Sequence, residues 1–435
     1  MMDAVDSRLP VWKQLSQTKV GPLQLPWFVA FSIVIFLAIY TETVPVDMLG
    51  GFGIILSLGW LLGKIGGVIP GLNKFGGSTI LSMLVPAVLV MYNLLPDNSI
   101  QAVTMLMSEA NFLDLYVFSL VTGSILGMNR QVLVQGFARM VIPMLVGLVL
   151  AMLIPAVIGQ FIGLGFEDTL FNIVTPSMAG GIGGGVLPLA LGYSDIQGID
   201  YGEMVATLAP ASILANFFSI AGAAIVSQLG ERQPALTGQG QLVRQGEDMV
   251  IENNRKETPV NYQSIGIGLF LLVAVYLLGN ILQGIIGLPA AVIVIFVSTV
   301  LKYFDVLPRS VEDGAKQLNG LISNVFTAPL MVGLGIIYLD LQAVLDILTW
   351  QYLIVVVSVV VVLGLTGLIL SKYLNMYPVE ASILSLNQSA MGGTGNVAIL
   401  ATSDRQSLMP FAQVATRIGG AITISLMITL MKLFG

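Results

Sequence analysis

The chain of 435 residues contains no cysteine and no histidine. Without cysteine there are no disulfides, thiolate metal ligands or cysteine nucleophiles, and without histidine there are no imidazole ligands and no histidine proton relays. Any ion that the protein binds must therefore meet oxygen ligands, which suit hard cations such as Na⁺ better than transition metals. We expect no transition-metal site.

Charge is scarce as well, because only 10% of the residues are charged, against about 25% in a typical soluble domain. Hydrophobic residues make up 56% of the chain, and the mean hydropathy is +0.90. A chain this apolar cannot cover itself with polar surface in water, so the lipid bilayer is its expected solvent. The net charge of -6 offers no basic patch to nucleic acid. The composition predicts an all-α integral membrane protein that does not bind nucleic acid.

Long apolar runs divide the chain into transmembrane segments, since a helix needs about 20 apolar residues to cross the hydrocarbon. A polar segment, 1–25, comes first and is followed by a single span at 26–43. Ten more runs then form two groups of five, for about eleven transmembrane helices in all. These runs are 48–65, 77–95, 112–128, 139–163 and 204–228 in the first half, and 263–284, 287–303, 318–338, 350–371 and 408–433 in the second.

Positive and acidic loops alternate between these runs. Lys13 precedes the first span, and Glu42 and Asp47 follow it. Because positive loops stay in the cytoplasm, the alternation predicts a cytoplasmic amino terminus and a carboxyl terminus outside. The only long hydrophilic stretch between runs, 229–262, is interpreted as a flexible cytoplasmic linker.

A glycine-rich motif occurs once in each half of the chain. The sequence GGIG at 180–183 has a counterpart, GGTG, at 392–395, which lies 212 residues later. Each motif falls between the fourth and fifth runs of a five-run unit, 48–228 or 263–433. Because the first unit begins outside and the second inside, the sequence predicts two inverted repeats.

Runs of glycine form poor helix, and unpaired backbone groups in lipid cost several kcal/mol each. We interpret 171–193 as a re-entrant hairpin that enters from outside and 380–401 as its counterpart from the cytoplasm. The helix that follows each tip would direct its positive end at the midplane, which suits an anion. Paired broken segments of this kind are typical of the binding site of a secondary transporter.

Close helix packing is the alternative for an isolated glycine motif, and the second copy in the matching position favours a binding site. The residues that we expect around a substrate at the two tips are Gly180, Gly181, Gly183, Gly392, Gly393, Thr394 and Gly395.

Arg417 lies about nine residues inside the last span, with no acidic residue within a helical turn. An arginine in such a place costs at least about 2.5 kcal/mol on insertion scales. A bidentate substrate carboxylate fits guanidinium geometry and would offset this cost. The alternatives are snorkelling to the surface and pairing with a distant acid such as Glu380.

Arg405 follows the second hairpin, beside Asp404. It is a candidate for a second substrate carboxylate, and its alternatives are a positive-inside anchor and a local ion pair.

Neutral oxygens and amides gather around the second motif and offer ligands for Na⁺ together with freed backbone carbonyls. Ordinary hydrogen bonds between helices are the alternative for each of them. The candidates are Asn387, Ser389, Asn396, Gln413 and Thr416.

At this point the chain resembles the 2-hydroxycarboxylate transporter family, whose members carry citrate, malate and related acids in bacteria. The resemblance covers nearly the whole length. Its most specific blocks are AGGIGGGVLPL at 179–189, YPVE at 377–380, MGGTGNVA at 391–398, LMPFAQ at 408–413 and RIGGA at 417–421.

The resemblance implies secondary transport in the bacterial cytoplasmic membrane, with Na⁺ or H⁺ as the coupling ion or with exchange against lactate, and no other cofactor. It also implies a homodimer, elevator-like movement of the hairpin domain, and contact between Arg417 and a substrate carboxylate. Met391, which precedes the second Gly-Gly, is neutral. An arginine there would grip a tricarboxylate more firmly, so malate is favoured over citrate.

A second hypothesis is the membrane subunit of a Na⁺-pumping decarboxylase, which is also apolar and built from repeats. Such a subunit would place an ionised aspartate inside its broken segments. Neither 176–193 nor 381–401 contains an acidic residue, which favours the transporter.

Overall fold

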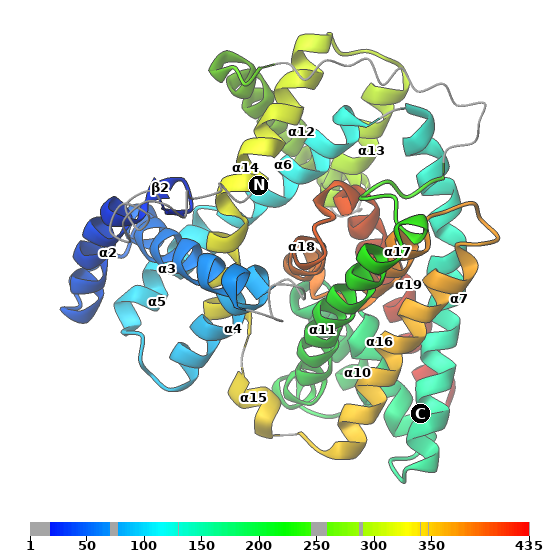
Figure 1. Ribbon diagram of the computed structural model, residues 1–435. Coiled ribbons are helices and arrows are strands. Elements are labelled where there is room, and N and C mark those ends of the chain that lie inside the picture. The colour runs from blue at the N-terminus through cyan, green and yellow to red at the C-terminus, as the bar shows by residue number, and fades with distance from the viewer. Residues whose placement is uncertain are drawn as a thin grey trace. The chain divides into compact units, whose positions relative to one another are not determined.

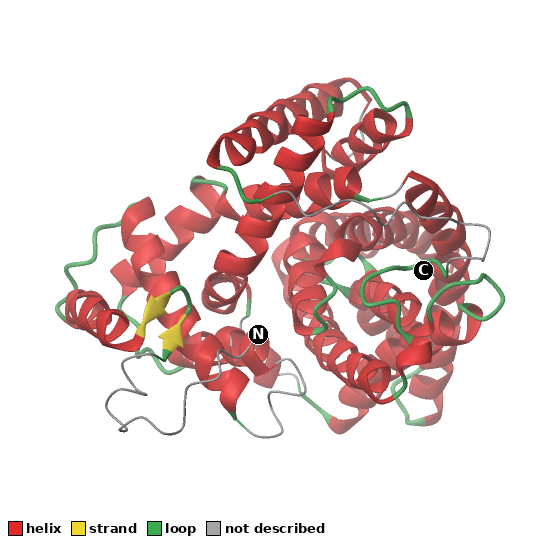
Figure 2. Ribbon diagram, turned by 45° about the horizontal axis from the view of Figure 1, so that its top comes forward, coloured by secondary structure: helices red, strands yellow, loops and turns green. Residues whose placement is uncertain are grey.

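Helices account for almost all of the computed structural model (Figures 1 and 2). Among the described residues, the only named strands are β1 (Lys19–Val20) and β2 (Leu23–Gln24), which pair antiparallel. The predicted all-α class is thus confirmed. Parts of the predicted amino-terminal segment and linker, 1–17 and 245–258, lie outside the described residues. The structure describes residues 18–69, 77–128, 130–244, 259–286, 290–339, 341–346 and 348–434.

Seven helices among the described residues are long and apolar enough to cross a membrane, and an eighth span results if one bent pair counts as a single span. That pair, Asp97–Glu109 and Phe112–Gly127, bends by 41°. Three other predicted spans coincide with shorter apolar helices, so the count of eleven is not reached by length alone. The seven are Met48–Val68, Leu133–Phe161, Glu203–Arg232, Tyr262–Ile285, Arg309–Tyr338, Trp350–Leu370 and Gln406–Leu433.

The chain divides into two compact units, and the first contains the described residues up to Leu115 together with Ile322–Gln342. Small residues let its helices approach closely, as membrane helices do. A Cβ added to Gly59 of α3 would strike the backbone of Pro329 in α14. The helices of this unit are α2 (Leu25–Tyr40), α3 (Met48–Val68), α4 (Gly77–Met91), α5 (Asp97–Thr104), η2 (Met105–Glu109) and the second half of α14 (Arg309–Tyr338).

The second unit holds both glycine motifs. Its long helices are α6 (Phe112–Gly127, from Tyr116), α7 (Arg130–Phe161), α11 (Tyr201–Arg232), α12 (Tyr262–Ile286), α13 (Ala290–Tyr303), the first half of α14, α16 (Trp350–Leu370) and α19 (Met409–Phe434). Its shorter elements are α8 (Phe166–Asp168), η3 (Thr169–Val174), α9 (Thr175–Met178), η4 (Ile182–Val186), α10 (Leu187–Gln197), η5 (Pro234–Leu236), α17 (Pro378–Leu386), η6 (Asn387–Ser389), α18 (Gly392–Thr402) and η7 (Gln406–Leu408). A further short helix, α15 (Leu341–Asp346), lies where the chain passes between the units.

Helix α16 shows how sequence sets the packing around the second motif. It begins at Thr349, whose hydroxyl accepts a hydrogen bond from the amide of Tyr352 at 3.2 Å. It packs against α7, where Leu363 and Thr366 lie beside Gly147, while another face carries Gly364 and Gly367. Ser382 of α17 donates to the Gly364 carbonyl at 2.8 Å. The glycine face therefore seats α17 directly against α16.

Candidate functional site

The first glycine motif breaks a helix inside the second unit. Helix α9 ends at Met178, and Gly180 and Gly181 follow with φ of 91° and 97°. Residues with a Cβ atom rarely adopt a positive φ, whereas glycine adopts it freely. The amide of Val186 then donates to the Gly181 carbonyl at 2.8 Å as the chain becomes helical again. The pair of glycines thus makes a sharp tip between α9 and η4.

The second motif makes a similar break between α17 and α18. The chain leaves η6 through an extended Ala390, and Gly392 has a φ of 65°. Two side chains of α11 hold this tip. Asn216 accepts a hydrogen bond from the amide of Met391 at 3.0 Å, and the Ser219 hydroxyl lies 2.6 Å from that of Ser389. Buried polar groups on α11 therefore replace partners that the broken helix has lost.

The two tips touch each other. A Cβ added to Gly181 would lie 2.7 Å from the amide nitrogen of Gly392, so the backbones are in direct contact. A Cβ added to Gly420 of α19 would lie 2.5 Å from the carbonyl oxygen of Ala179. The amino-terminal ends of η4 and α18 therefore begin at one place, between the hairpins and α19. Two positive helix ends converge there.

The polar ends of Gln413 and Arg417 lie beside Gly393. A Cβ added there would be in ordinary van der Waals contact with the side-chain nitrogen of Gln413 at 3.4 Å, with Val117 at 3.6 Å and with Arg417 Nη2 at 3.9 Å. Gln413 and Arg417 lie one helical turn apart on α19, so both side chains lie on the same face of that helix. The alternative prediction paired Arg417 with Glu380. In the structure, the Glu380 carboxylate pairs with Arg405 instead.

Several oxygen atoms surround the hydroxyl of Thr416, the residue before Arg417 on α19. Its hydroxyl lies 2.7 Å from the Asn387 carbonyl oxygen, 2.6 Å from Asn396 Oδ1 and 2.9 Å from the Ala412 carbonyl oxygen. One hydroxyl hydrogen serves only one of these three acceptors. Such an excess of oxygen lone pairs suits a cation.

Buried amide groups without partners surround the same point. Asn387, Asn396 and Gln413 are all fully buried. Asn387 Oδ1, Asn396 Nδ2 and both polar atoms of Gln413 have no hydrogen-bond partner in the described part of the chain. Leaving such groups unsatisfied costs about 1–3 kcal/mol each. They are therefore groups to which a ligand is expected.

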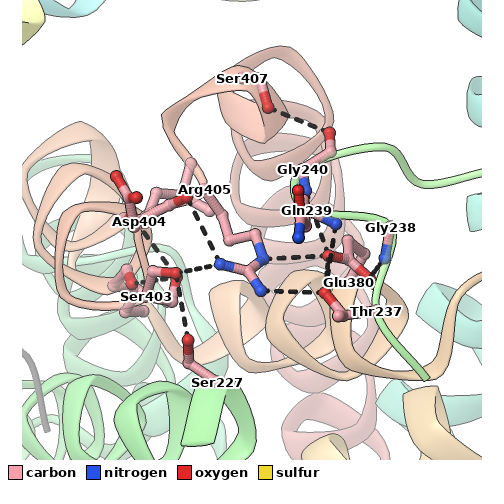
Figure 3. A network of polar contacts seen from close by, with 12 residues as sticks. Ser227, Thr237, Gly238, Gln239, Gly240, Glu380, Ser403, Asp404, Arg405 and Ser407 are labelled. Atoms are coloured by element: carbon pink, nitrogen blue, oxygen red, sulfur yellow. Dashed lines mark hydrogen bonds and ion pairs between the residues drawn. The ribbon is translucent and has the colours of Figure 1, made fainter. Parts of the chain in front are cut away.

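Two further candidates, Ser389 and Arg405, have partners of their own. Ser389 pairs with Ser219. Arg405 forms a buried ion pair with Glu380, with 2.9 Å between Nε and Oε1 (Figure 3). Of the interpretations of Arg405, the ion pair is the one that the structure shows, and its partner is 25 residues away rather than the adjacent Asp404.

The sequence analysis missed Asn216, Ser219 and Gln388. Asn216 and Ser219 lie three residues apart in an apolar run, ILANFFSI, so they share one helical face. This spacing of two polar residues in an apolar helix could have predicted a polar contact with a neighbouring segment. Gln388 is buried with its Nε2 unpartnered among the described residues, and no pattern around it distinguished it from the other polar residues of the motif.

Two helices that break inside an apolar protein and meet tip to tip are typical of a secondary transporter. The chain belongs to the 2-hydroxycarboxylate transporter family, whose model matches residues 20–429.

Curated relatives match nearly end to end. A Na(+)-malate symporter of Bacillus subtilis (strain 168) is 41% identical over 425 residues, which cover 98% of this chain and 95% of the relative. A citrate/malate-proton symporter of the same organism is 36% identical over 418 residues, covering 96% and 93%. A citrate/sodium symporter of Salmonella typhimurium is 29% identical over 420 residues, covering 94% of each.

The protein is therefore a 2-hydroxycarboxylate transporter with several membrane-crossing helices, and it is not an enzyme. The alternative of a decarboxylase subunit is wrong, since the family and the relatives are transporters.

Two adjacent glycines of α19 test the contact between this helix and the first tip. Gly420→Ala places a methyl against the Ala179 carbonyl, whereas nothing lies within 4 Å of a Cβ on Gly419. We expect Gly420→Ala to lose most uptake of labelled malate by cells, and Gly419→Ala to transport normally at equal expression. Equal uptake by both variants would contradict the close contact.

Proposed function

We propose that the protein is a Na⁺-malate symporter whose substrate binds beside Gly393, between the second hairpin tip and α19. The observation that carries this proposal is the position of Arg417 and Gln413, whose polar ends lie beside Gly393, next to the contact between the two hairpin tips. A guanidinium binds a carboxylate through two parallel hydrogen bonds. The unpartnered Gln413 amide supplies a donor and an acceptor, which match a carboxylate oxygen and the neighbouring hydroxyl of a 2-hydroxy acid.

The converging helix ends supply the remaining positive potential. The first backbone N–H groups of η4 and α18 lack partners within their own helices, and they start at the joint between Gly181 and Gly392. A second carboxylate of malate fits this environment without another arginine. Because Met391 stands before the second Gly-Gly, no cation is present there for a third carboxylate. Malate is therefore favoured over citrate, in line with the name of the 41% identical relative.

Na⁺ is the proposed coupling ion, and the oxygens around Thr416 are its proposed ligands. They come from Thr416 itself, the Asn387 carbonyl and Asn396. No acidic residue occurs in 176–193 or 381–401, and the chain has no histidine. The buried carboxylate of Glu380 is paired with Arg405, whereas Na⁺ finds neutral oxygens in place around Thr416. We assign Arg405 to the structure of the hairpin and not to the substrate.

The architecture that we propose has eleven spans, from the eight candidates and the three shorter helices Leu25–Tyr40, Gly77–Met91 and Ile293–Tyr303. Two inverted repeats are supported by the order of elements, because each half has four spans, a broken hairpin and a final span. The amino terminus lies in the cytoplasm, and the hairpins are re-entrant. The protein forms a homodimer in the bacterial cytoplasmic membrane. Each protomer works by elevator movement, and lactate is the proposed partner in exchange.

The guanidinium is tested by Arg417→Lys. Lysine keeps the charge and cannot form two parallel bonds to a carboxylate, so we expect uptake of labelled malate into proteoliposomes to fall by about tenfold or more, as for the loss of a charge-assisted pair. Lys432→Gln, near the end of the same helix, serves as the control. Unchanged malate affinity in Arg417→Lys would remove Arg417 from the site.

Coupling is tested with purified protein in liposomes under separate Na⁺ and pH gradients. We expect malate uptake to follow the Na⁺ gradient, and Thr416→Val to raise the Na⁺ concentration needed for half-maximal uptake, because it removes the central oxygen. Thr423→Val is the matched control, since that hydroxyl bonds only to its own helix at Gly419. Uptake that ignores Na⁺ and follows pH would replace the proposal with proton coupling.

A further inference from the structure

The chain directly after α11 and η5 is not a free linker. Residues 237–243, which we call the strap, pack against the base of the second hairpin (Figure 3). Leu242 and Val243 are almost completely buried. The sequence interpretation of a flexible linker therefore does not describe this part of 229–262, because two apolar side chains and several hydrogen bonds hold it down.

The first residues of the strap contact the carboxylate of Glu380, which lies in the first turn of α17. This side chain is fully buried, and its oxygens accept four hydrogen bonds. Three come from the strap, namely from the Thr237 hydroxyl at 2.8 Å, the Gly238 amide at 2.9 Å and the Gly240 amide at 3.1 Å. The fourth comes from Arg405 Nε. Both oxygens of a buried charge are thereby satisfied.

Arg405 ties this carboxylate to the other leg of the hairpin. It follows the end of α18, where its guanidinium also donates to the Ser403 carbonyl and to the Thr237 hydroxyl, the latter at 3.0 Å. Glu380 starts the hairpin and Arg405 closes it, so the ion pair joins the two legs at their base. Thr237 of the strap contacts both partners.

The far end of the strap is fastened to the residues just before α17. The amide of Tyr377 donates to the Leu242 carbonyl at 2.9 Å, and the amide of Arg244 donates to the Asn375 carbonyl at 3.0 Å. Val243 and Met376 face each other between these bonds as an antiparallel pair. These contacts fix the strap to the chain that leads into α17.

The first hairpin lacks the basic residue that such an ion pair needs. Residues 166–197 contain Glu167, Asp168 and Asp195 and no lysine or arginine. An ion pair between its own two legs is therefore impossible. The two hairpins differ in how their bases are held, although their tips meet.

We propose that the strap, with Glu380 and Arg405 as positioning residues, keeps the second hairpin closed at its base throughout transport. This inference rests on the proposed function. Substrate then leaves on the linker side without separation of α17 from α18, so the second hairpin moves only as part of a larger body. Separation of α17 from α18 at this base would take Arg405 away from the fully buried Glu380 carboxylate, which is unfavourable in a low-dielectric interior.

A disulfide across the strap tests this proposal, and the natural absence of cysteine gives a clean background. Val243→Cys and Met376→Cys together place two thiols on a directly opposed antiparallel pair. We expect malate uptake by the oxidised double variant, with its bond verified by mass spectrometry, to equal uptake by the same protein after reduction. Uptake lost on oxidation and restored by reductant would overturn the proposal.

Release of the strap is the complementary test. Glu380→Gln and Thr237→Val should speed hydrogen exchange at Gly238 and Gly240, and they should lower the maximal rate of malate uptake with little change in half-saturation. Faster exchange with an unchanged uptake rate in both variants would overturn the proposal. If the unaltered chain takes up no malate, the proposed function fails instead, and hydrogen exchange still reports on the strap.

Discussion

A helix that breaks in an apolar interior leaves backbone N–H and C=O groups without partners, and the second unit is arranged around this constraint. The breaks at Gly180–Gly181 and Gly392 are placed against each other, so that each tip shields the backbone of the other. Asn216 and Ser219 of α11 supply side-chain partners to the second tip. Among the described residues, Asn387, Asn396 and Gln413 still have buried polar atoms without partners, and these are the groups that we assign to the ligands.

Arg405 and Arg417, the two arginines near the second hairpin, have different surroundings and therefore different proposed roles. Arg405 has a buried carboxylate and backbone carbonyls around its guanidinium, so its charge serves to close the base of the hairpin. Arg417 Nη2 lies beside Gly393 instead, close to the side-chain nitrogen of Gln413. Both arginines follow the same motif in the sequence, and only the fold separates their surroundings.

Much of the site was predictable, because its signals are local or repeated. The two glycine motifs, the position of Arg417 and the oxygen-rich set around Thr416 follow from residue types, from spacing and from the poor fit of glycine runs to ordinary helices. The ion pair of Glu380 with Arg405 was not predictable, because it depends on the return of the chain after 25 residues. The packing of residues 237–243 was also missed, because composition does not reveal which polar segment lies over a buried carboxylate.

The number of spans shows a further limit of sequence reasoning. Apolar runs indicate eleven segments, yet several helices are shorter than a bilayer requires. Length alone does not settle how such helices sit in lipid, since tilt, bilayer thinning and packing against neighbours all accommodate mismatch. The hairpins avoid this uncertainty because their breaks are set by glycine backbone geometry.

The central claim, that both tips border one water-accessible substrate site, is tested most directly by thiol labelling. Single cysteines at Ile182 and Thr394, each next to a tip, would be treated with a small water-soluble reagent, with a cysteine at the exposed Tyr262, just before the apolar run 263–284, as the control. The account predicts that both tip cysteines react and that malate slows both reactions, without effect at the control position. Tip cysteines that do not react, or that react at a rate independent of malate, would contradict it.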